Sequence, residues 1–182
     1  MDSETRTRDE WLALRCQTNE DGAYDALVST LEMPLLYYAF KLTGNRDRAL
    51  DVLQEAWIRA FRGMRKLKDP GSLRPWLYSI VHGVAIDDLR RGNRREAVES
   101  PELETDDIAE PASFDADDAR AIHDALDKLE PSHREVLTLF FLEGFTVSET
   151  AGIVGCAEGT VKSRLHYAKK ALRKIMDGEN NA

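Results

Sequence analysis

Hydrophobic residues recur along the chain at steps of three and four, and no segment shows sustained alternation of polar and apolar positions. This periodicity indicates α-helices rather than β-strands. In the N-terminal half the predicted helices lie within residues 24–42, with a break or kink expected at Pro34, and over residues 47–67 and 73–91. The stripe expected to be buried on the second of them consists of Leu50, Leu53, Trp57, Phe61 and Met64. The pattern therefore predicts an all-α fold.

Residues 146–170 are predicted to form a short helix, a glycine turn and a second, basic helix. Thr146 and Glu149 have the spacing of a capping box, and Gly155 suits the positive φ that ends a helix. The apolar side chains of the second helix share one face: Val161, Leu165, Ala168 and Leu172. The adjacent face is cationic and polar: Lys162, Ser163, His166, Lys169, Lys170 and Arg173. This pattern is typical of a helix-turn-helix that binds the DNA major groove, although a solvated lysine-rich helix end has the same charge pattern.

A further helix is expected before this motif, in a C-terminal unit that starts near Ala119. Ser132 and Glu135, which follow Pro131, have the spacing of a second capping box. Gly144 is expected to end the helix. Its apolar face consists of Val136, Leu139 and Phe140. The C-terminal part is therefore predicted to be a small helical domain.

The formal net charge of −8 is unevenly distributed along the chain. Residues 96–118 carry ten acidic side chains, two prolines and no Lys or Arg, and contain little that could pack in a core. Such a segment is expected to be a flexible acidic linker, extended by like-charge repulsion. Whether it has a role beyond connecting two domains stays open at this point. Most of the negative charge lies here, so the basic helix after Gly155 remains free to contact phosphate.

No enzyme, metal or cofactor site is expected. The four histidines occupy unrelated positions, and the sequence has neither a P-loop nor a dinucleotide-type glycine loop. Cys16 and Cys156 are too few for a disulfide framework and lie outside any metal-binding pattern. The first 17 residues lack the apolar core of a signal peptide, and the longest apolar run, residues 136–142, is too short to span a membrane. We therefore expect a cytoplasmic protein without membrane insertion.

Three motifs in the C-terminal unit, taken together, resemble region 4 of the sigma factors of bacterial RNA polymerase. The closest resemblance is to the short extracytoplasmic-function (ECF) group of the sigma-70 family. The motifs are Leu129-Glu-Pro-x-x-Arg-Glu-Val-Leu137, Glu143-Gly-Phe-Thr-Val-Ser-Glu149 and Gly159-Thr-Val-Lys-Ser-Arg-Leu165. In the N-terminal half, residues 51–60 are similar to region 2.2, and residues 74–80 and 85–91 are similar to regions 2.3 and 2.4.

The resemblance implies two helical domains on an acidic tether. The expected divisions are an N-terminal segment 1–22, a region 2 bundle 23–95, the linker 96–118, a region 4 helix-turn-helix 119–176 and a tail 177–182. The implied partners are core RNA polymerase, through its β′ clamp and β flap, promoter DNA and an anti-sigma factor. No cofactor is implied. By the same resemblance, the linker would pass through the basic channel of the polymerase in place of RNA.

The resemblance also implies three sets of functional residues. Those expected to bind core polymerase are Asp51, Gln54, Glu55, Ile58 and Arg59. Those expected to bind the −10 element, around a base-capturing loop at residues 68–73, are Lys66, Lys68, Ser72, Arg74, Trp76, His82, Arg90, Arg91, Arg94 and Arg95. Those expected to bind the −35 element are Thr160, Lys162, Ser163, Arg164, His166, Tyr167, Lys169 and Lys170. By periodicity alone, the first set is simply the solvated side of an amphipathic helix.

The chain departs from the family pattern at three places. His82 and Gly83 stand where family members often carry Arg-Asn, so a side chain expected to specify the flipped base is absent. Thr150 replaces a usual isoleucine, and Tyr167 replaces a usual arginine. Two alternatives remain: a stand-alone helix-turn-helix regulator, which would need a sensor or dimerisation domain, and an interaction protein of sigma shape without promoter activity.

Overall fold

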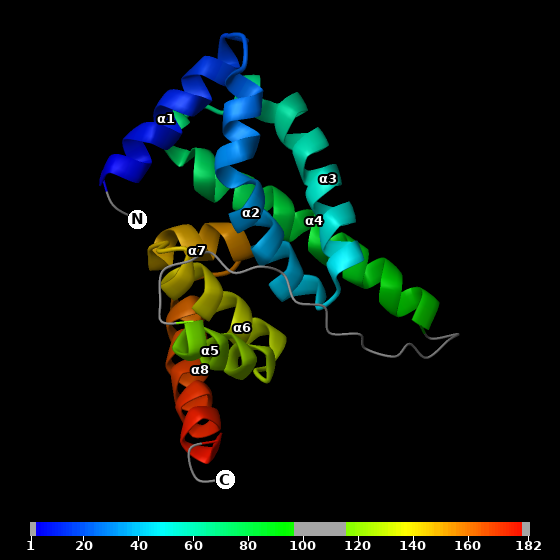
Figure 1. Cartoon of the computed structure of the whole chain (residues 1–182), viewed down its shortest axis with the longest axis vertical. Helices are drawn as coiled ribbons and strands as arrows, with labels where there is room; N and C mark the ends of the chain where they lie inside the picture. The colour runs from blue at the N-terminus through cyan, green and yellow to red at the C-terminus, as the bar shows by residue number, and fades with distance from the viewer. Residues whose placement is uncertain (1–2, 97–115, 180–182) are drawn as a thin grey trace. The chain divides into compact units, whose positions relative to one another are not determined.

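The computed structural model describes residues 3–96 and 116–179, with side chains over 3–91 and 122–178, and every regular element in these ranges is helical (Figure 1). The chain divides into two compact units, Met1–Ala109 and Glu110–Ala182. The prediction of an all-α fold with two helical domains is confirmed. Of the predicted acidic linker, residues 97–115 lie outside the described residues.

Over residues 3–96, the first unit is a bundle of four helices. They are α1 (Ser3–Gln17), α2 (Ala23–Thr43), α3 (Arg46–Gly63) and α4 (Leu73–Glu96), and two 3-10 turns, η1 (Met64–Lys66) and η2 (Pro70–Ser72), connect α3 to α4. Gly44 ends α2 at φ 66°, and the Asn45 side chain then caps α3 by accepting the Arg48 N–H. Large side chains with almost no exposure fill the centre: Leu27, Leu31, Leu35, Tyr38, Met64, Leu73, Leu77 and Tyr78.

Helix α2 runs unbroken through Pro34, so the expected break at this residue is wrong. Proline removes one backbone hydrogen bond and crowds the preceding turn, which disfavours a helix interior. Here Leu31 and Leu35, on either side of it, are at most 1% exposed and pack in the core. Tertiary packing supplies most helix stability in proteins, and it holds α2 together despite the proline.

The buried face of α3 also differs from the predicted stripe. Leu53 and Met64 are buried, but Leu50 is 44% exposed and Phe61 39% exposed, and Trp57 is half-buried. The buried positions on α3 are Ala49, Val52, Leu53, Ala56 and Ala60. Because α3 packs against both α2 and α4, its small residues face them and the bulky ones are displaced to the edge. There Phe61 contacts Trp57 and Tyr24, with ring centroids 5.5 and 5.0 Å apart.

Residues 1–22, for which the sequence predicts no element, contain α1. Leu12, Ala13 and Cys16 are buried against the rest of the first unit. Asp9, also on α1, is buried and pairs with Arg74 at the start of α4. The N-terminal segment is therefore part of the first bundle rather than an appendage to it.

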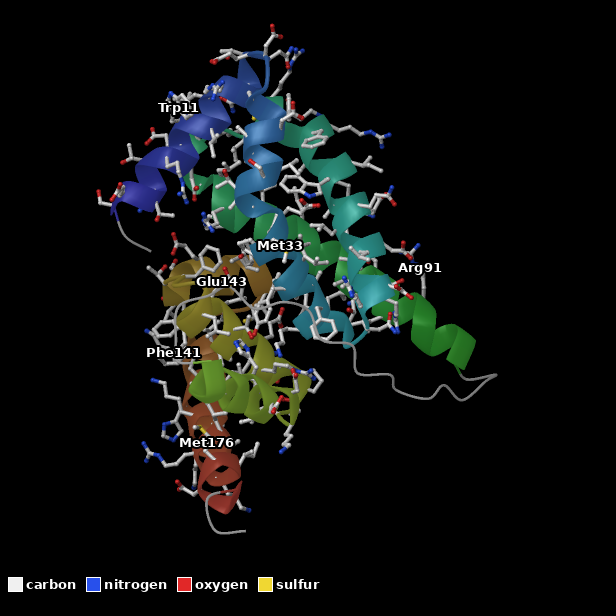
Figure 2. All side chains as sticks on the ribbon, viewed as in Figure 1. Trp11, Met33, Arg91, Phe141, Glu143 and Met176 are labelled. Carbon is white, nitrogen blue, oxygen red and sulfur yellow. The ribbon has the colours of Figure 1, made fainter. Side chains whose placement is uncertain are left out.

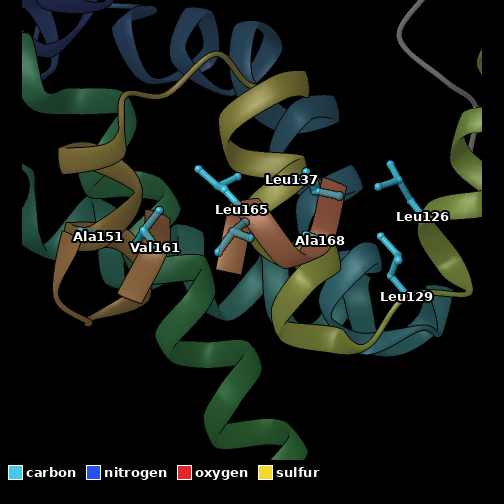
Figure 3. Close-up of a cluster of buried hydrophobic side chains, with 8 residues drawn as sticks. Leu126, Leu129, Leu137, Ala151, Val161, Leu165 and Ala168 are labelled. Carbon is cyan, nitrogen blue, oxygen red and sulfur yellow. The ribbon is translucent and has the colours of Figure 1, made fainter. Parts of the chain in front are cut away.

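The second unit is built around its last helix. Its elements are α5 (Ala116–Asp127), α6 (Pro131–Leu137), a π-helical turn η3 (Thr138–Leu142), α7 (Val147–Val154) and α8 (Glu158–Glu179). Helix α8 contacts α5, α6 and α7, and their apolar side chains form one core (Figure 3). That core consists of Leu126, Leu129, Val136, Leu137, Ala151, Val161, Leu165 and Ala168.

The second capping box, expected from Ser132 to Glu135, is not formed. Pro131 occupies the first turn of α6, which makes Glu130 the N-cap residue. Ser132 therefore lies inside the first turn, where its hydroxyl donates to the Glu130 carboxylate, and Glu135 is buried.

Across the described ranges, no helix has the length and apolar character that crossing a membrane requires.

Candidate nucleic-acid and polymerase interfaces

The turn between α7 and α8 is held by local contacts at both ends of α7. The Thr146 hydroxyl accepts the Glu149 N–H at 3.2 Å, and the Glu149 carboxylate accepts the Thr146 N–H at 2.8 Å. Gly155 ends α7 at φ 70°, and its N–H donates to the Ala151 carbonyl at 2.9 Å. The capping box and the glycine C-cap predicted from the sequence are both confirmed. They set the angle at which α8 leaves the turn.

Helix α8 presents most of the predicted −35 residues on one exposed surface, which we call the α8 face. Of the four predicted apolar residues, Val161, Leu165 and Ala168 are buried, and Leu172 is half-buried against the same core. The exposed members of the α8 face are Thr160, Lys162, Ser163, His166, Tyr167, Lys169 and Lys170, and Arg164 is half-buried. Lys169 lies at the edge of this surface, because its ammonium group sits 4.9 Å from the Phe141 ring centroid.

A mostly apolar cavity of about 630 Å³ lies between α5, η3 and α8. Apolar side chains that line it include Ile122, Leu126, Phe141, Leu142, Leu172 and Met176, and its charged lining residues are Lys169, Arg173 and Asp177. Phe141 is 53% exposed and Leu142 is 39% exposed; Phe141 and Met176 are labelled in Figure 2. The motifs and periodicity of the sequence do not predict this site. The signal for it was the run Phe140-Phe141-Leu142, which is too apolar for one helix face to bury.

In the first unit, the connection between α3 and α4 begins at Met64 and contains the expected base-capturing loop at residues 68–73. Lys66 and Lys68 are exposed on this connection, which we call the loop from here on. The Asp69 carboxylate accepts the Gly71 N–H at 3.1 Å and the Ser72 hydroxyl at 2.5 Å, which gives η2 a fixed shape. Because the Ser72 hydroxyl already donates to Asp69, its role within this structure is to shape the loop.

Arg74, predicted to bind the −10 element, instead takes part in packing within the first unit. The residue is 8% exposed. Its Nε and Nη2 donate to the two Asp9 carboxylate oxygens at 2.7 and 3.2 Å. This guanidinium connects α4 to α1 and has little exposure to solvent. The observed geometry therefore favours a packing role for Arg74, and its predicted DNA contact stays a prediction.

Trp76 and His82 are both half-buried on α4. The Trp76 ring covers Gly63, where a Cβ would come within 3.0 Å of it. His82 Nδ1 lies 3.5 Å from the Tyr38 hydroxyl. Gly83, by contrast, has open space: a Cβ built there meets no described atom within 4 Å. Packing around this position therefore does not require glycine.

The basic end of α4 is described only in part. Arg90 and Arg91 are exposed, and Arg91 Nε donates to the Asp87 carbonyl at 3.3 Å (Figure 2). Arg94 and Arg95 belong to α4, but their side chains lie outside the described residues.

The predicted polymerase-binding residues lie together on the outer side of α3. Asp51, Gln54, Ile58 and Arg59 are exposed and Glu55 is half-buried. Arg59 pairs with Glu55 at 2.8 Å and approaches Asp87 of α4 at 3.8 Å. Leu50 and Phe61 extend this surface, which is consequently more apolar than expected. We call the whole surface the α3 face: Leu50, Asp51, Gln54, Glu55, Ile58, Arg59 and Phe61.

The comparisons with known proteins agree with this geometry. Sigma-70 region 2 matches residues 27–95, and sigma-70 region 4 matches residues 119–172. The chain is 37% identical over 143 residues to the ECF RNA polymerase sigma factor SigL of Mycobacterium tuberculosis H37Rv, a match that covers 75% of this chain and 78% of SigL. It is 34% identical over 143 residues to the ECF RNA polymerase sigma factor EcfG of Rhodopseudomonas palustris TIE-1, covering 76% and 77% of the two chains.

Solved structures show the same fold at lower identity. The sigma factor RpoE of Bartonella quintana, solved with the anti-sigma factor NepR, matches with a TM-score of 0.73 and 24% identity over 86% of this chain and 98% of RpoE. CnrH, solved with the cytosolic domain of CnrY, matches with a TM-score of 0.66 and 23% identity over 93% and 97%. On the strength of its two matched regions and its ECF relatives, the chain belongs to the sigma-70 family of RNA polymerase sigma factors, in the ECF group.

Proposed function

We propose that the two units divide the work of a promoter-directing sigma factor. The first unit docks on core RNA polymerase through the α3 face and captures a melted −10 strand with the loop between α3 and α4. The second unit binds the −35 element with the α8 face. The exposed cationic α8 face follows a first helix, α7, that is capped at both ends, and this arrangement is the observation that carries the proposal. We place the protein in the cytoplasm, acting without catalysis or cofactor.

Recognition of the −35 element rests on residues 160–170. A helix inserted in the major groove uses residues near its N-terminus for base edges and flanking cations for phosphates. Lys162 and Arg164 lie in the first two turns of α8, where both kinds of contact are within reach. Each phosphate neutralised adds about 0.9 to the slope of log affinity against log salt. Tyr167 offers a hydroxyl to a phosphate in place of the guanidinium usual in the family.

Docking on the polymerase uses both units in this proposal. On the α3 face, the exposed Leu50, Ile58 and Phe61 supply apolar area, while Asp51 and Arg59 supply charges that set orientation. This mixture suits the β′ clamp. In the second unit, the cavity beside Phe141 suits an apolar segment of the β flap.

Capture of the −10 strand is assigned to the Lys66–Leu73 loop and to the basic end of α4. Single-stranded DNA binding requires cations along the backbone and a site that accepts an unstacked base. Lys66, Lys68, Arg90 and Arg91 are exposed and provide the charge. Arg74 is excluded from this set because Asp9 already holds it.

An anti-sigma protein is the regulator we propose for this chain. RpoE was solved with the anti-sigma factor NepR, and CnrH was solved with the cytosolic domain of CnrY. A partner that covers the α3 face or the cavity in the second unit would prevent polymerase docking without any change to the DNA-binding residues.

Run-off transcription with purified core polymerase and a genomic promoter library tests the function. The double variant Lys162→Ala/Arg164→Ala is expected to lose −35-dependent initiation and to keep wild-type affinity for core polymerase. Lys174→Ala, an exposed cation farther along α8, is the control with charge removed on the same helix. Loss of core binding in the double variant would contradict the division of labour. Duplex binding without any initiation would instead support a stand-alone regulator.

A further inference from the structure

Helix α1 contacts the loop to which −10 capture is assigned, although it lies outside the residues that match sigma-70 region 2. That match begins at residue 27, whereas α1 ends at Gln17. Helix α1 nevertheless packs against both turns of the loop, η1 and η2, and against the start of α4. These contacts reach the loop at its beginning, its middle and its end.

Gln17 holds the beginning of the loop. Its Nε2 donates to the Leu67 carbonyl at 2.7 Å and to the Met64 carbonyl at 3.2 Å. The Met64 carbonyl also accepts the Leu67 N–H at 3.1 Å within η1. Leu67 follows the end of η1, and helix ends leave carbonyls without partners from the helix itself. A glutamine amide nitrogen carries two hydrogens, so this one side chain can bond both carbonyls at once.

Asp9 of α1 holds the end of the loop, and Arg6, one turn earlier on α1, lies near its middle. At the end, the Asp9 carboxylate binds the Arg74 guanidinium, and both side chains are at most 10% exposed. In the middle, Arg6 lies beside Gly71: a Cβ built on Gly71 would come 3.9 Å from Arg6 Nε. Between these anchors Lys66 and Lys68 stay exposed. The backbone that presents them is therefore shaped from outside the loop.

We propose that Gln17 is a positioning residue for −10 recognition. By donating to the Met64 and Leu67 carbonyls, Gln17 holds residues 64–68 in the conformation that accepts the melted strand. The loop is then already ordered before the strand binds, so binding loses less conformational entropy. Gln17 makes no contact with DNA in this proposal. The inference rests on the proposed function of the loop, and it adds α1 to the promoter-recognition apparatus.

Variants at Gln17 separate hydrogen bonding from size. Gln17→Glu keeps the shape of the side chain but places carboxylate oxygens against two carbonyls, while Gln17→Lys keeps a donor. Thr18→Ala is the matched control, because the Thr18 hydroxyl bonds carbonyls of α1 itself, those of Leu14 and Arg15. Each variant is assembled into holoenzyme. The probes are short single-stranded oligonucleotides selected by wild-type holoenzyme from a pool randomised over the −10 element, and the same oligonucleotides with single bases changed.

The readout is the ratio of affinities for selected and changed oligonucleotides, measured by fluorescence anisotropy. A net hydrogen bond corresponds to about a fivefold change in an equilibrium constant, so Gln17→Glu is expected to reduce the ratio by at least about fivefold. Gln17→Lys is expected to keep most of it, and Thr18→Ala all of it. A merely structural role would lower the active fraction or core affinity and leave the ratio unchanged.

Hydrogen exchange gives a second readout of the same inference. Amides of residues 64–73 are expected to exchange faster in Gln17→Glu than in Thr18→Ala, while the central part of α3 stays protected in both. A wild-type affinity ratio in Gln17→Glu would overturn the inference and leave the function of the loop intact. If wild-type holoenzyme preferred no sequence at all, the assignment of the loop would fail, and this inference with it.

Discussion

The buried pair of Asp9 and Arg74 yields the sharpest stability prediction. The two side chains are 1% and 10% exposed, and two hydrogen bonds at 2.7 and 3.2 Å join them. Asp9→Asn keeps the size of the side chain but removes the charge that balances a buried guanidinium. Removing one partner of a buried pair costs about 3–5 kcal/mol. We take about 3 kcal/mol here, because the asparagine oxygen still accepts one hydrogen bond.

Urea unfolding followed by tryptophan fluorescence measures this loss in the first unit alone. The chain has three tryptophans, Trp11, Trp57 and Trp76, and all belong to that unit. With a slope of about 1.5 kcal/mol per molar urea, the expected loss lowers the unfolding midpoint by about 2 M. Far-UV circular dichroism reports the helices of both units. In the variant, its unfolding curve should therefore no longer coincide with the fluorescence curve.

A double variant decides whether Arg74 has any role besides packing. Asp9→Leu/Arg74→Met removes both charges, and replacing a buried pair with apolar groups is often close to neutral. This variant is expected to regain most of the lost stability and to open promoters as the wild type does. A midpoint shift below about 0.5 M in Asp9→Asn would refute the argument from burial. If the double variant is stable but does not open promoters, Arg74 contributes directly to binding the −10 element.

Three further predictions concern single side chains. Thr150 is fully buried in α7 and its hydroxyl has no hydrogen-bond partner among the described residues, so Thr150→Val should stabilise the second unit by about 1 kcal/mol in thermal unfolding followed by circular dichroism. Burial raises the pKa of the Cys16 thiol. The stabilisation linked to the neutral thiol is present at low pH and is lost as pH rises through the folded-state pKa. Alkylation near pH 8 should therefore modify the half-buried Cys156 before Cys16. The hydrogen bond from Ser132 lowers the pKa of Glu130. The stabilisation from this hydrogen bond is present above the unfolded-state pKa and is lost as pH falls through the folded-state pKa. Ser132→Ala should therefore raise the pKa of Glu130 measured by NMR titration.

Much of the candidate site in the second unit could be predicted because its determinants are local. The capping box from Thr146 to Glu149 and the glycine C-cap at Gly155 involve residues a few positions apart, whose spacing is visible in the sequence. The same reasoning failed at Ser132, because Pro131 begins the helix two positions earlier than a cap at Ser132 would, and Glu130 is the N-cap residue instead. Motif spacing predicts a cap only when no stronger local constraint sets the helix start.

In the first unit, the features that sequence reasoning did not predict arise from contacts between residues far apart in sequence. Arg74 has the position of a DNA contact within its motif, but Asp9, 65 residues away, holds it in the interior. Leu50 and Phe61 match the helical period, yet the alanines of α3 face α2 and α4 because close helix packing favours small side chains. Neither outcome can be derived from the periodicity of one helix.

Helical periodicity, caps and motif order are properties of neighbouring residues, so the amino-acid sequence was enough to predict a helical chain, two domains and membership among the sigma factors. The exposed face of α3, the continuation of α2 through Pro34 and the contacts of α1 with the loop between Met64 and Arg74 became visible only in the packed structure. These outcomes depend on which surfaces meet when the helices pack. The free energy of that packing is larger than the local helix preferences of single residues, which are all that the periodicity of a sequence reports.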